Sequence, residues 1–280
     1  MATLRSLLSL GFITLNLTFW CVPLVVLSLS RILWPAGKGH FRSALRWIYL
    51  TAVRADDWWF ESVLGHRLDL PKPQLVPEAA SIVVANHRSW VDVLLIQSLM
   101  RRSGSIVNFL AKKELAWIPI LGLILWAYEF PLLTRRASDS QDDAQRRLDD
   151  MRRVQDACDR VKESTSAILS FAEGTRFTRD KRAMLQSPYR HLLPPRPGGF
   201  EALCRALEPQ AGCVVDVTIV HPEPFDFFRF LGGSVPVPQL RIETFPIDEV
   251  CRAGPRRWLN DRWQLKDEMI AAALPKPQAG

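Results

Sequence analysis

The stretch Ser81-Ile82-Val83-Val84-Ala85-Asn86-His87-Arg88-Ser89-Trp90-Val91-Asp92 indicates the fold class. Its first five residues are typical of a short buried strand, and the polar residues that follow predict a turn. The apolar spacing of Val93–Met100 then predicts a helix. Open α/β sheets carry their functional residues at the carboxyl ends of strands, so the polar turn is a candidate site.

Further apolar segments outside this unit predict more strands and helices. Short strands are expected at Ile106–Leu110, Ala167–Phe171 and Val214–Val220. The apolar segment Glu114–Leu133 predicts either buried helix or a second membrane span, and the charge-rich Arg135–Glu163 predicts a solvated helix. Strands that alternate with helices predict an α/β domain.

The N-terminal segment predicts contact with a membrane. Ser6–Ser30 carries no charge, and about 20 apolar residues are enough to span a bilayer. A cleaved signal peptide and a hairpin that enters one leaflet near Pro23 are the alternatives. We expect Trp34–Leu70, which is aromatic and basic, to be helical at the membrane surface. If the segment spans the bilayer, the excess of Lys and Arg after it predicts that the rest of the chain faces the cytoplasm.

Composition excludes several classes of protein. With 280 residues, 48% hydrophobic and 23% charged, the chain can build a sizeable core and is not disordered. Five scattered cysteines make a disulfide scaffold or a structural zinc site improbable. No G-x-S-x-G, H-E-x-x-H or phosphate-binding G-x-x-x-x-G-K motif is present. The net charge of +7 favours an anionic partner: nucleic acid, an anionic membrane or a phosphorylated substrate.

His87 and Asp92 have the chemistry of a base and its orienting carboxylate. An Asp can fix the tautomer of a His and stabilise its imidazolium while the other ring nitrogen takes a proton. Residues five apart on one straight helix point about 140° apart, so His87 must lie in the turn and Asp92 at the helix start. Taken alone, the spacing of the pair favours a purely structural turn.

Two further motifs are candidates for binding an anion. Glu173-Gly174-Thr175-Arg176 directly follows a predicted strand and offers close backbone approach, a hydroxyl and a guanidinium. Arg135 and Arg136 follow the apolar segment. A surface turn and a solvated helix start are the respective alternatives. The remaining histidines have no neighbours at ligand spacing and are interpreted as structural or surface residues: His40, His66, His191 and His221.

Several motifs stand in a fixed order along the chain. After His87 and Asp92 come Lys112-Lys113-Glu114-Leu115, Trp117, Pro119, Gly122, Glu129-Phe130-Pro131, Arg135 and Phe171-Ala172-Glu173-Gly174-Thr175-Arg176. From about Ile82 to Val220, this series resembles the glycerolipid acyltransferase family, the PlsC-like lysophosphatidic acid acyltransferases. It is most similar to the branch with lysocardiolipin acyltransferase-like proteins, in which an acidic residue, Phe and Pro precede the basic residues. Gly198-Gly199-Phe200 ahead of Asp216-Val217-Thr218-Ile219 is a further similarity, and Ala172 departs from the Pro of many members.

The resemblance implies a mixed sheet flanked by helices, with an N-terminal membrane helix or hairpin. It implies transfer of a fatty acyl group from acyl-CoA or an acyl carrier protein to the free hydroxyl of 1-acyl-sn-glycerol 3-phosphate. The thioester is a co-substrate, and neither a cofactor nor a metal ion is expected. In this family His87 would be the general base and Asp92 its partner. Arg135 would help to hold the acceptor phosphate, and the residues that bind glycerol phosphate would be Glu173, Gly174, Thr175 and Arg176.

These expectations define the organisation and the alternatives. Residues 1–70 are predicted as a membrane-associated helical segment, 71–250 as the catalytic domain and 251–280 as a C-terminal tail. The location is a membrane, the inner membrane in a bacterium, with anionic lipids as partners and no nucleic acid. The alternatives are another lysophospholipid acceptor, a non-catalytic membrane scaffold of the same fold, and a membrane-anchored nucleic-acid binder. Only the positive net charge suggests the last of these. Glu114–Leu133 could equally line a groove for the acyl chain or form ordinary core.

Overall fold

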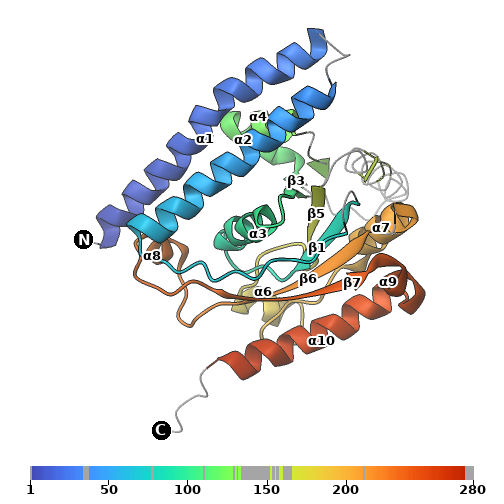
Figure 1. Cartoon of the computed structure of the whole chain (residues 1–280). Helices are drawn as coiled ribbons and strands as arrows, with labels where there is room; N and C mark the ends of the chain where they lie inside the picture. The colour runs from blue at the N-terminus through green and yellow to red at the C-terminus, as the bar shows by residue number, and fades with distance from the viewer. Residues whose placement is uncertain are drawn as a thin grey trace.

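A five-stranded mixed sheet lies at the centre of the computed structural model (Figure 1). The strands run in the order β2 (Ile106–Phe109), β5 (Ser166–Phe171), β1 (Ser81–Ala85), β6 (Cys213–Val220) and β7 (Gln239–Pro246). The first four are parallel, and β7 is antiparallel to β6. The structure describes residues 2–33, 38–76, 79–109, 111–128, 130, 132–133, 152, 155, 158–159, 166–210 and 212–274.

Helices cover both faces of this sheet, so its central strands are buried on both sides. Because side chains alternate along a strand, Val83 and Ala85 pack into one hydrophobic cluster, and Ile82 and Val84 pack into the other. The first cluster includes α3 (Val91–Arg101), η2 (Trp59–Val63) and α8 (Phe227–Leu231). The second includes α7 (Pro197–Leu207), α9 (Ile247–Ala253) and α10 (Pro255–Ala273). The predicted α/β fold and mixed sheet are therefore confirmed.

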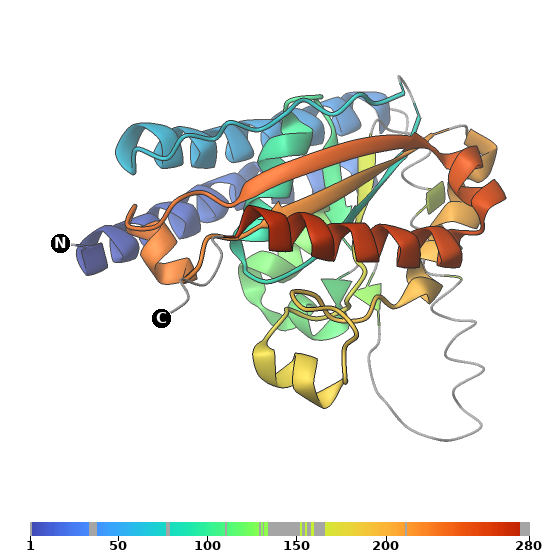
Figure 2. The same cartoon turned by 90° about the horizontal axis from the view of Figure 1, so that it is seen from below.

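The N-terminal segment forms two long helices that pack side by side. Helix α1 (Ala2–Leu33) continues through Pro23, and α2 (Lys38–Trp58) returns antiparallel beside it (Figures 1 and 2). Pro23 is therefore not the turn of a hairpin. Within α1, Thr3–Ser30 is long and apolar enough to cross a membrane, and it is the one such helix in the described part of the chain.

Helix α1 is attached to the rest of the protein along one face. Ser6 Oγ donates to the carbonyl of Phe228, and Ser9 Oγ donates to that of Leu231, both 2.7 Å away on α8. Asn16 Nδ2 donates to Asp56 Oδ1 on α2 at 2.9 Å. Further along, α1 packs against α2 and α4 (Pro119–Ala127). The opposite face of α1 is exposed.

Two predicted segments differ from the structure. Leu64–Leu70, which we expected to be helical, lies after the end of η2 and has no regular structure. In Glu114–Leu133, a 3-10 turn η3 (Lys113–Trp117) precedes α4, which has only 9 residues. About 20 residues are needed to span a bilayer, so α4 is too short to do so. After it, Leu132–Leu133 (β4) pairs with Ala111–Lys112 (β3) as a separate two-stranded sheet.

The C-terminal segment is part of the folded unit. Trp263 of α10 is fully buried in the second cluster and donates from Nε1 to the carbonyl of Leu193 at 3.0 Å. Lys266 is also fully buried, with its Nζ 2.5 Å from Asp216 Oδ1 on β6. Figure 2 shows α10 lying along β6 and β7. One further short helix, α6 (Arg179–Met184), projects near the carboxyl end of β5, and η4 (Glu208–Gln210) extends α7.

Candidate functional site

The site begins where β1 ends, and Asn86 fixes the direction in which the chain leaves the sheet. Its side-chain amide donates to the carbonyl of Ile219 at 2.9 Å and accepts from the N–H of Ile219 at 2.8 Å. This pair of bonds replaces the ladder bonds that β1 could no longer make with β6. The next residue, His87, therefore starts the turn at a defined place above the sheet edge.

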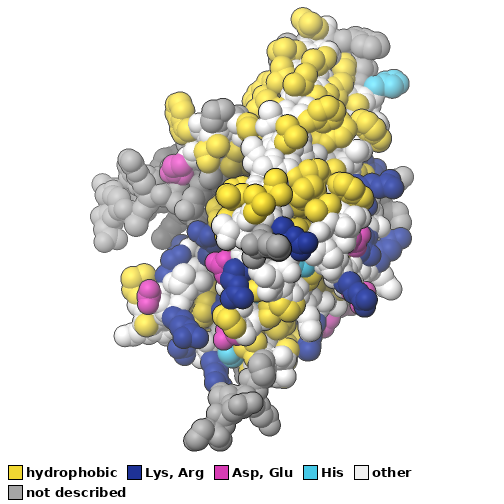
Figure 3. Space-filling model, turned by 90° about the vertical axis from the view of Figure 1, so that its left-hand side faces the viewer, with side chains coloured by type: hydrophobic (Ala, Val, Ile, Leu, Met, Phe, Trp, Pro, Cys, Tyr) yellow, Lys and Arg dark blue, Asp and Glu magenta, His cyan; other side chains and the backbone are white. Residues whose placement is uncertain are grey.

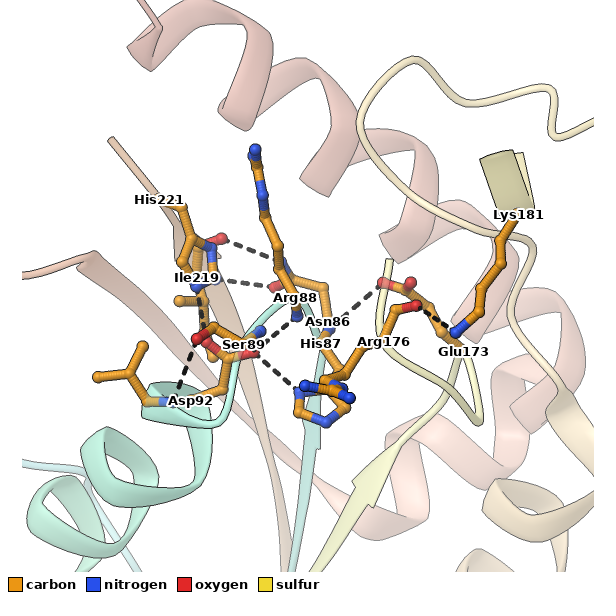
Figure 4. Close-up of polar contacts among 11 residues, drawn as sticks. Asn86, His87, Arg88, Ser89, Asp92, Glu173, Arg176, Lys181, Ile219 and His221 are labelled. Atoms are coloured by element: carbon orange, nitrogen blue, oxygen red, sulfur yellow. Dashed lines mark hydrogen bonds and ion pairs between the residues drawn. The ribbon is translucent and has the colours of Figure 1, made fainter. Parts of the chain in front are cut away.

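His87 and Asp92 form the pair that the sequence predicted. Nδ1 of His87 lies 2.9 Å from Oδ2 of Asp92 (Figure 4). His87 is in the turn, and Asp92 is in the first turn of α3. The His87 ring stacks on Phe171 of β5 with the centroids 3.9 Å apart, which fixes the plane of the imidazole. With a side chain 13% exposed, His87 reaches the surface, and among the described residues its Nε2 has no hydrogen-bond partner.

Among the described residues of the site, Asp92 accepts the most hydrogen bonds. Its Oδ2 also accepts from the backbone N–H groups of Arg88, at 2.7 Å, and Ser89, at 2.9 Å. Its Oδ1 accepts from Nε2 of His221 at 2.7 Å. Burial alone would raise the pKa of this carboxyl group, but charge and hydrogen bonds from His221, and then His87, lower it to about 2. Asp92 is therefore an anion at every physiological pH.

Glu173 joins the first loop to the second. One residue, Ala172, separates it from the end of β5. Glu173 is 2% exposed and accepts hydrogen bonds from the backbone N–H groups of His87, at 3.3 Å, and Leu193, at 3.4 Å. Burial raises its pKa to about 8, although the two backbone donors act in the opposite direction. The loops are also linked by the N–H of Phe177, which donates to the carbonyl of His87 at 2.7 Å.

The rest of the second loop provides an exposed cation beside the pair. Gly174 adopts a φ of +69°, which only glycine takes without strain, and turns the chain sharply after Glu173. Arg176 is exposed, and its guanidinium lies over the ring of Trp90, 5.1 Å from the centroid. Thr175 Oγ1 accepts from Nζ of Lys181 on α6 at 2.7 Å. Arg176 of this loop and Lys181 of α6 therefore place two cationic side chains beside the pair (Figure 4).

The structure brings together most of the predicted site residues. His87, Asp92 and the four residues 173–176 converge at the carboxyl ends of β1 and β5, which are neighbouring parallel strands. Arg135 and Arg136 lie outside the described residues, as does most of the predicted helix Arg135–Glu163. Within the described ranges, no group of three His, Cys, Asp or Glu side chains could hold a metal ion.

Sequence reasoning missed His221 as a member of the site. It contacts Asp92, although 129 residues separate the two. One signal could have revealed it: His221 directly follows the strand Cys213–Val220, just as Asn86 and His87 follow Ser81–Ala85. Carboxyl ends of parallel strands meet at one edge of the sheet, so polar residues after two neighbouring strands are expected to meet.

Comparisons with known proteins agree with this geometry. The family model described as "Acyltransferase" matches residues 67–221. The 1-acyl-sn-glycerol-3-phosphate acyltransferase 3 of Arabidopsis thaliana is 25% identical over 296 residues, covering 96% of this chain and 75% of that protein. The 1-acyl-sn-glycerol-3-phosphate acyltransferase delta is 29% identical in Bos taurus and 31% identical in Mus musculus, and each alignment covers 85% of this chain and 66% of the relative.

No solved structure matches the chain. The family match nevertheless covers more than half of the chain, including both loops of the site and every strand from β1 to β6. The relatives extend the similarity over most of the remaining residues. This chain therefore belongs to the acyltransferase family.

Proposed function

We propose that this acyltransferase moves a fatty acyl group from a thioester to the free hydroxyl of 1-acyl-sn-glycerol 3-phosphate, which gives phosphatidic acid. The observation that carries the proposal is the hydrogen-bonded His87–Asp92 pair, with an open Nε2, beside the cationic loop of Arg176. The names of the related proteins point to the same acceptor.

The chemistry needs a base but no enzyme nucleophile, because the thioester is already activated. Nε2 of His87 takes the proton of the acceptor hydroxyl as the oxygen attacks the thioester carbonyl. The tetrahedral intermediate then expels the thiolate, which receives the same proton from His87. Asp92 stabilises the imidazolium between these two steps, as its depressed pKa allows.

Two cationic side chains near His87 are suited to bind the phosphate of the acceptor. Arg176 presents a guanidinium, which matches the geometry of phosphate oxygens, and Trp90 holds it at the site. Lys181 adds a second positive charge through its bond to Thr175. Binding the phosphate here would hold the hydroxyl of the same molecule near Nε2, so that the contribution is positioning. Arg135 remains a predicted further phosphate contact, and Glu173 a predicted ligand of glycerol phosphate, although its carboxyl group is turned into the protein.

The N-terminal helix supports attachment to a membrane. The face of α1 opposite its buried side carries an exposed apolar stripe at helical spacing, and Figure 3 shows hydrophobic side chains gathered over the α1–α2 part of the molecule. Helix α4, which packs against α1, exposes Trp126, and Trp117 at the end of η3 and Ile118 just before α4 are exposed as well. The members of the α1 stripe are Leu4, Leu8, Leu15, Phe19, Val22, Val26, Leu29 and Leu33.

The contacts of α1 favour a helix that lies in one leaflet over one that spans the bilayer. Its other face is bonded to α8 through Ser6 and Ser9 and to Asp56 of α2 through Asn16. A spanning α1 would draw these polar groups, and the arginines of α2, into hydrocarbon at a cost of several kcal/mol. An immersed stripe leaves the polar side of α1 at the headgroups, with the catalytic domain at the membrane surface.

The test uses protein purified in detergent, labelled acyl-CoA and a panel of lysophospholipids, with acyl carrier protein as a second donor. We expect transfer to 1-acyl-sn-glycerol 3-phosphate, and a loss of about 10²- to 10⁴-fold in kcat for His87→Ala. His40→Ala, which changes an exposed histidine of α2, is the matched control and should retain activity.

Each outcome decides between the alternatives. Transfer to another lysophospholipid that requires His87 would keep the mechanism and change the acceptor. Transfer that survives His87→Ala would remove the histidine as the base. No transfer with either donor to any acceptor would leave the non-catalytic scaffold as the better description.

A further inference from the structure

We propose that His221 is a positioning residue for acyl transfer, which holds the Asp92 carboxylate in the orientation and ionisation state that the base His87 needs. This inference rests on the proposed role of His87. It concerns a residue that touches neither of the reacting groups and acts through Asp92 alone. The two histidines would share one carboxylate, each bonded to a different oxygen (Figure 4).

The two oxygens of Asp92 are held in different ways. Oδ2 has three donors, namely Nδ1 of His87 and the backbone N–H groups of Arg88 and Ser89. Oδ1 has a single donor among the described residues, which is Nε2 of His221 at 2.7 Å. The side chains of Asp92 and His221 are 0% and 1% exposed, so water cannot replace that donor without a rearrangement. A single substitution of His221 would therefore leave Oδ1 of Asp92 without its donor.

Losing that donor would change the charge of the carboxylate as well as its position. A buried anionic oxygen without a hydrogen bond is costly, and the cost falls when the group takes up a proton. A protonated Asp92 could no longer stabilise the imidazolium of His87, so His87 would become a weaker base. The burial of Asp92 already acts in this direction, and the bonds from the two histidines counter it.

The neighbourhood of the pair contains few other charges that could take over. His221 lies against Phe225, with ring centroids 4.9 Å apart in an edge-on contact. Arg88 and Glu223, on the two adjoining loops, are paired with each other at 3.0 Å. Glu173 is directed to the backbone of His87 and carries a raised pKa, so it adds little negative charge near neutral pH.

A second buried histidine shows what a merely structural role looks like. His66 is 7% exposed, stacks on Phe230 and forms a hydrogen bond with its carbonyl at 2.9 Å. These contacts involve only the hydrophobic cluster and its backbone. Replacing His66 tests the general cost of removing a buried, bonded histidine, without touching Asp92.

The experiment compares His221→Leu, His221→Gln and His66→Leu with the wild-type enzyme in detergent. Gln places an amide donor at about the position of Nε2, whereas Leu fills the space without a donor. We expect kcat to fall about 10- to 100-fold in His221→Leu with little change in KM, and to recover largely in His221→Gln. We expect the acid limb of kcat/KM against pH to move to lower pH in His221→Leu, because His87 loses its counter-charge.

His66→Leu should keep the pH profile and kcat of the wild type, even if its thermal midpoint falls. The inference would be overturned if His221→Leu kept the wild-type kcat and pH profile, or if His221→Gln were as impaired as His221→Leu. In the first case Asp92 needs no second histidine, and in the second the loss of activity does not come from the missing hydrogen-bond donor.

A measurement that needs no turnover separates this inference from the proposed function. Diethyl pyrocarbonate modifies neutral imidazole, so the pH dependence of modification at His87, read by mass spectrometry, reports the pKa of that ring. We expect a lower midpoint in His221→Leu and a wild-type midpoint in His221→Gln. If the wild-type protein is inactive but the shift is observed, the proposed function is rejected and the coupling between His221 and His87 is retained. If the enzyme is active and needs His87 but shows no shift, the proposed function is retained and the coupling is rejected.

Discussion

Glu173 is a buried carboxyl group that links two loops and makes the stability of the folded protein depend on pH. Its oxygens accept from the N–H groups of His87 and Leu193, and burial raises its pKa to about 8 from an ordinary value of 4.5. Between those two values the folded protein keeps a proton that the unfolded chain releases. The contribution of Glu173 to stability is therefore complete below pH 4.5 and is lost as the pH rises through 8.

Replacing Glu173 with Gln should remove this pH dependence. Gln keeps an acceptor for one backbone donor and cannot ionise, so we expect the thermal midpoint of Glu173→Gln to decline less between pH 5 and pH 9 than that of the wild type, by about 5 °C. Differential scanning fluorimetry in detergent measures it. Glu249→Gln, at an exposed position of α9, is the control. Equal slopes for wild type and Glu173→Gln would contradict a buried, protonated Glu173.

Among the single elements, helix α1 has one face that packs against the rest of the protein and one apolar face that is exposed. Ser6 attaches one side of α1 to α8, Asn16 and aromatic side chains attach it to α2, and the apolar stripe occupies the opposite face. Burying a Leu, Val or Phe side chain in an apolar medium contributes about 1.5–3 kcal/mol. In the proposed attachment, the stripe would supply enough free energy to hold the protein to a bilayer without spanning it.

Weakening the stripe should release the protein from membranes without unfolding it. We expect Leu15→Ser, Phe19→Ser and Val22→Ser together to reduce co-sedimentation with vesicles by about tenfold or more. All three side chains are exposed, so the thermal midpoint in detergent should stay near that of the wild type. The control replaces Thr14 and Thr18, also exposed on α1, with Ser. Undiminished sedimentation of the triple variant would show that another surface holds the membrane.

The attachment of α10 depends on a buried group of charges. Nζ of Lys266 lies 2.5 Å from Oδ1 of Asp216 and 2.6 Å from the carbonyl of Val217. Arg262, one turn earlier, bonds to Oδ2 of Asp216 at 2.6 Å and to Glu243 of β7. This network explains why an Asp stands in the middle of the otherwise apolar strand β6, where the sequence by itself offered only a family resemblance.

Lys266→Met should destabilise the whole domain. Breaking a buried ion pair by removing one partner costs about 3–5 kcal/mol, because the other charge stays buried with fewer partners. We expect the thermal midpoint to fall by about 10 °C, while Lys72→Met, at an exposed position, leaves it unchanged. A midpoint for Lys266→Met within a degree or two of the wild type would mean that Arg262 alone neutralises Asp216.

For the molecule as a whole, the proposed attachment to a membrane would give the excess of positive charge a function. The net charge is +7, and Figure 3 shows Lys and Arg side chains spread over the surface below the apolar α1–α2 region, with Asp and Glu among them. Such a surface is attracted to anionic headgroups, and each Lys or Arg close to them contributes about 1 kcal/mol. Added salt screens this attraction but not the burial of the apolar stripe.

We expect binding to vesicles to strengthen as the fraction of anionic lipid rises, and to weaken with added salt. On neutral phosphatidylcholine vesicles the residual binding should be insensitive to salt, since only the stripe contributes. Flotation of the protein with each vesicle type measures this. Salt-sensitive binding to duplex DNA of comparable strength would instead favour the nucleic-acid reading of the charge.

Prediction from the sequence succeeded where the relevant contacts are local. The strand Ser81–Ala85, the turn and the helix that carries Asp92 follow from adjacent residues, so the His87–Asp92 pair could be derived from spacing and helix geometry. The C-terminal helices and the antiparallel strand β7 were not predicted, because β7 alternates exposed and half-buried residues at the sheet edge and gives only a weak apolar signal.

The sequence by itself determined the α/β class, the apolar N-terminal helix and the residues of the two loops, because each depends on patterns within about a dozen neighbouring residues. The tertiary structure alone decided that His221 and Asp92 meet, that Glu173 faces the backbone of His87, and that Lys266 neutralises Asp216. These partners are between 50 and 129 residues apart. No local spacing encodes such contacts, since they depend on the order of parallel strands in the sheet and on the free energy of pairing every charge that folding removes from water.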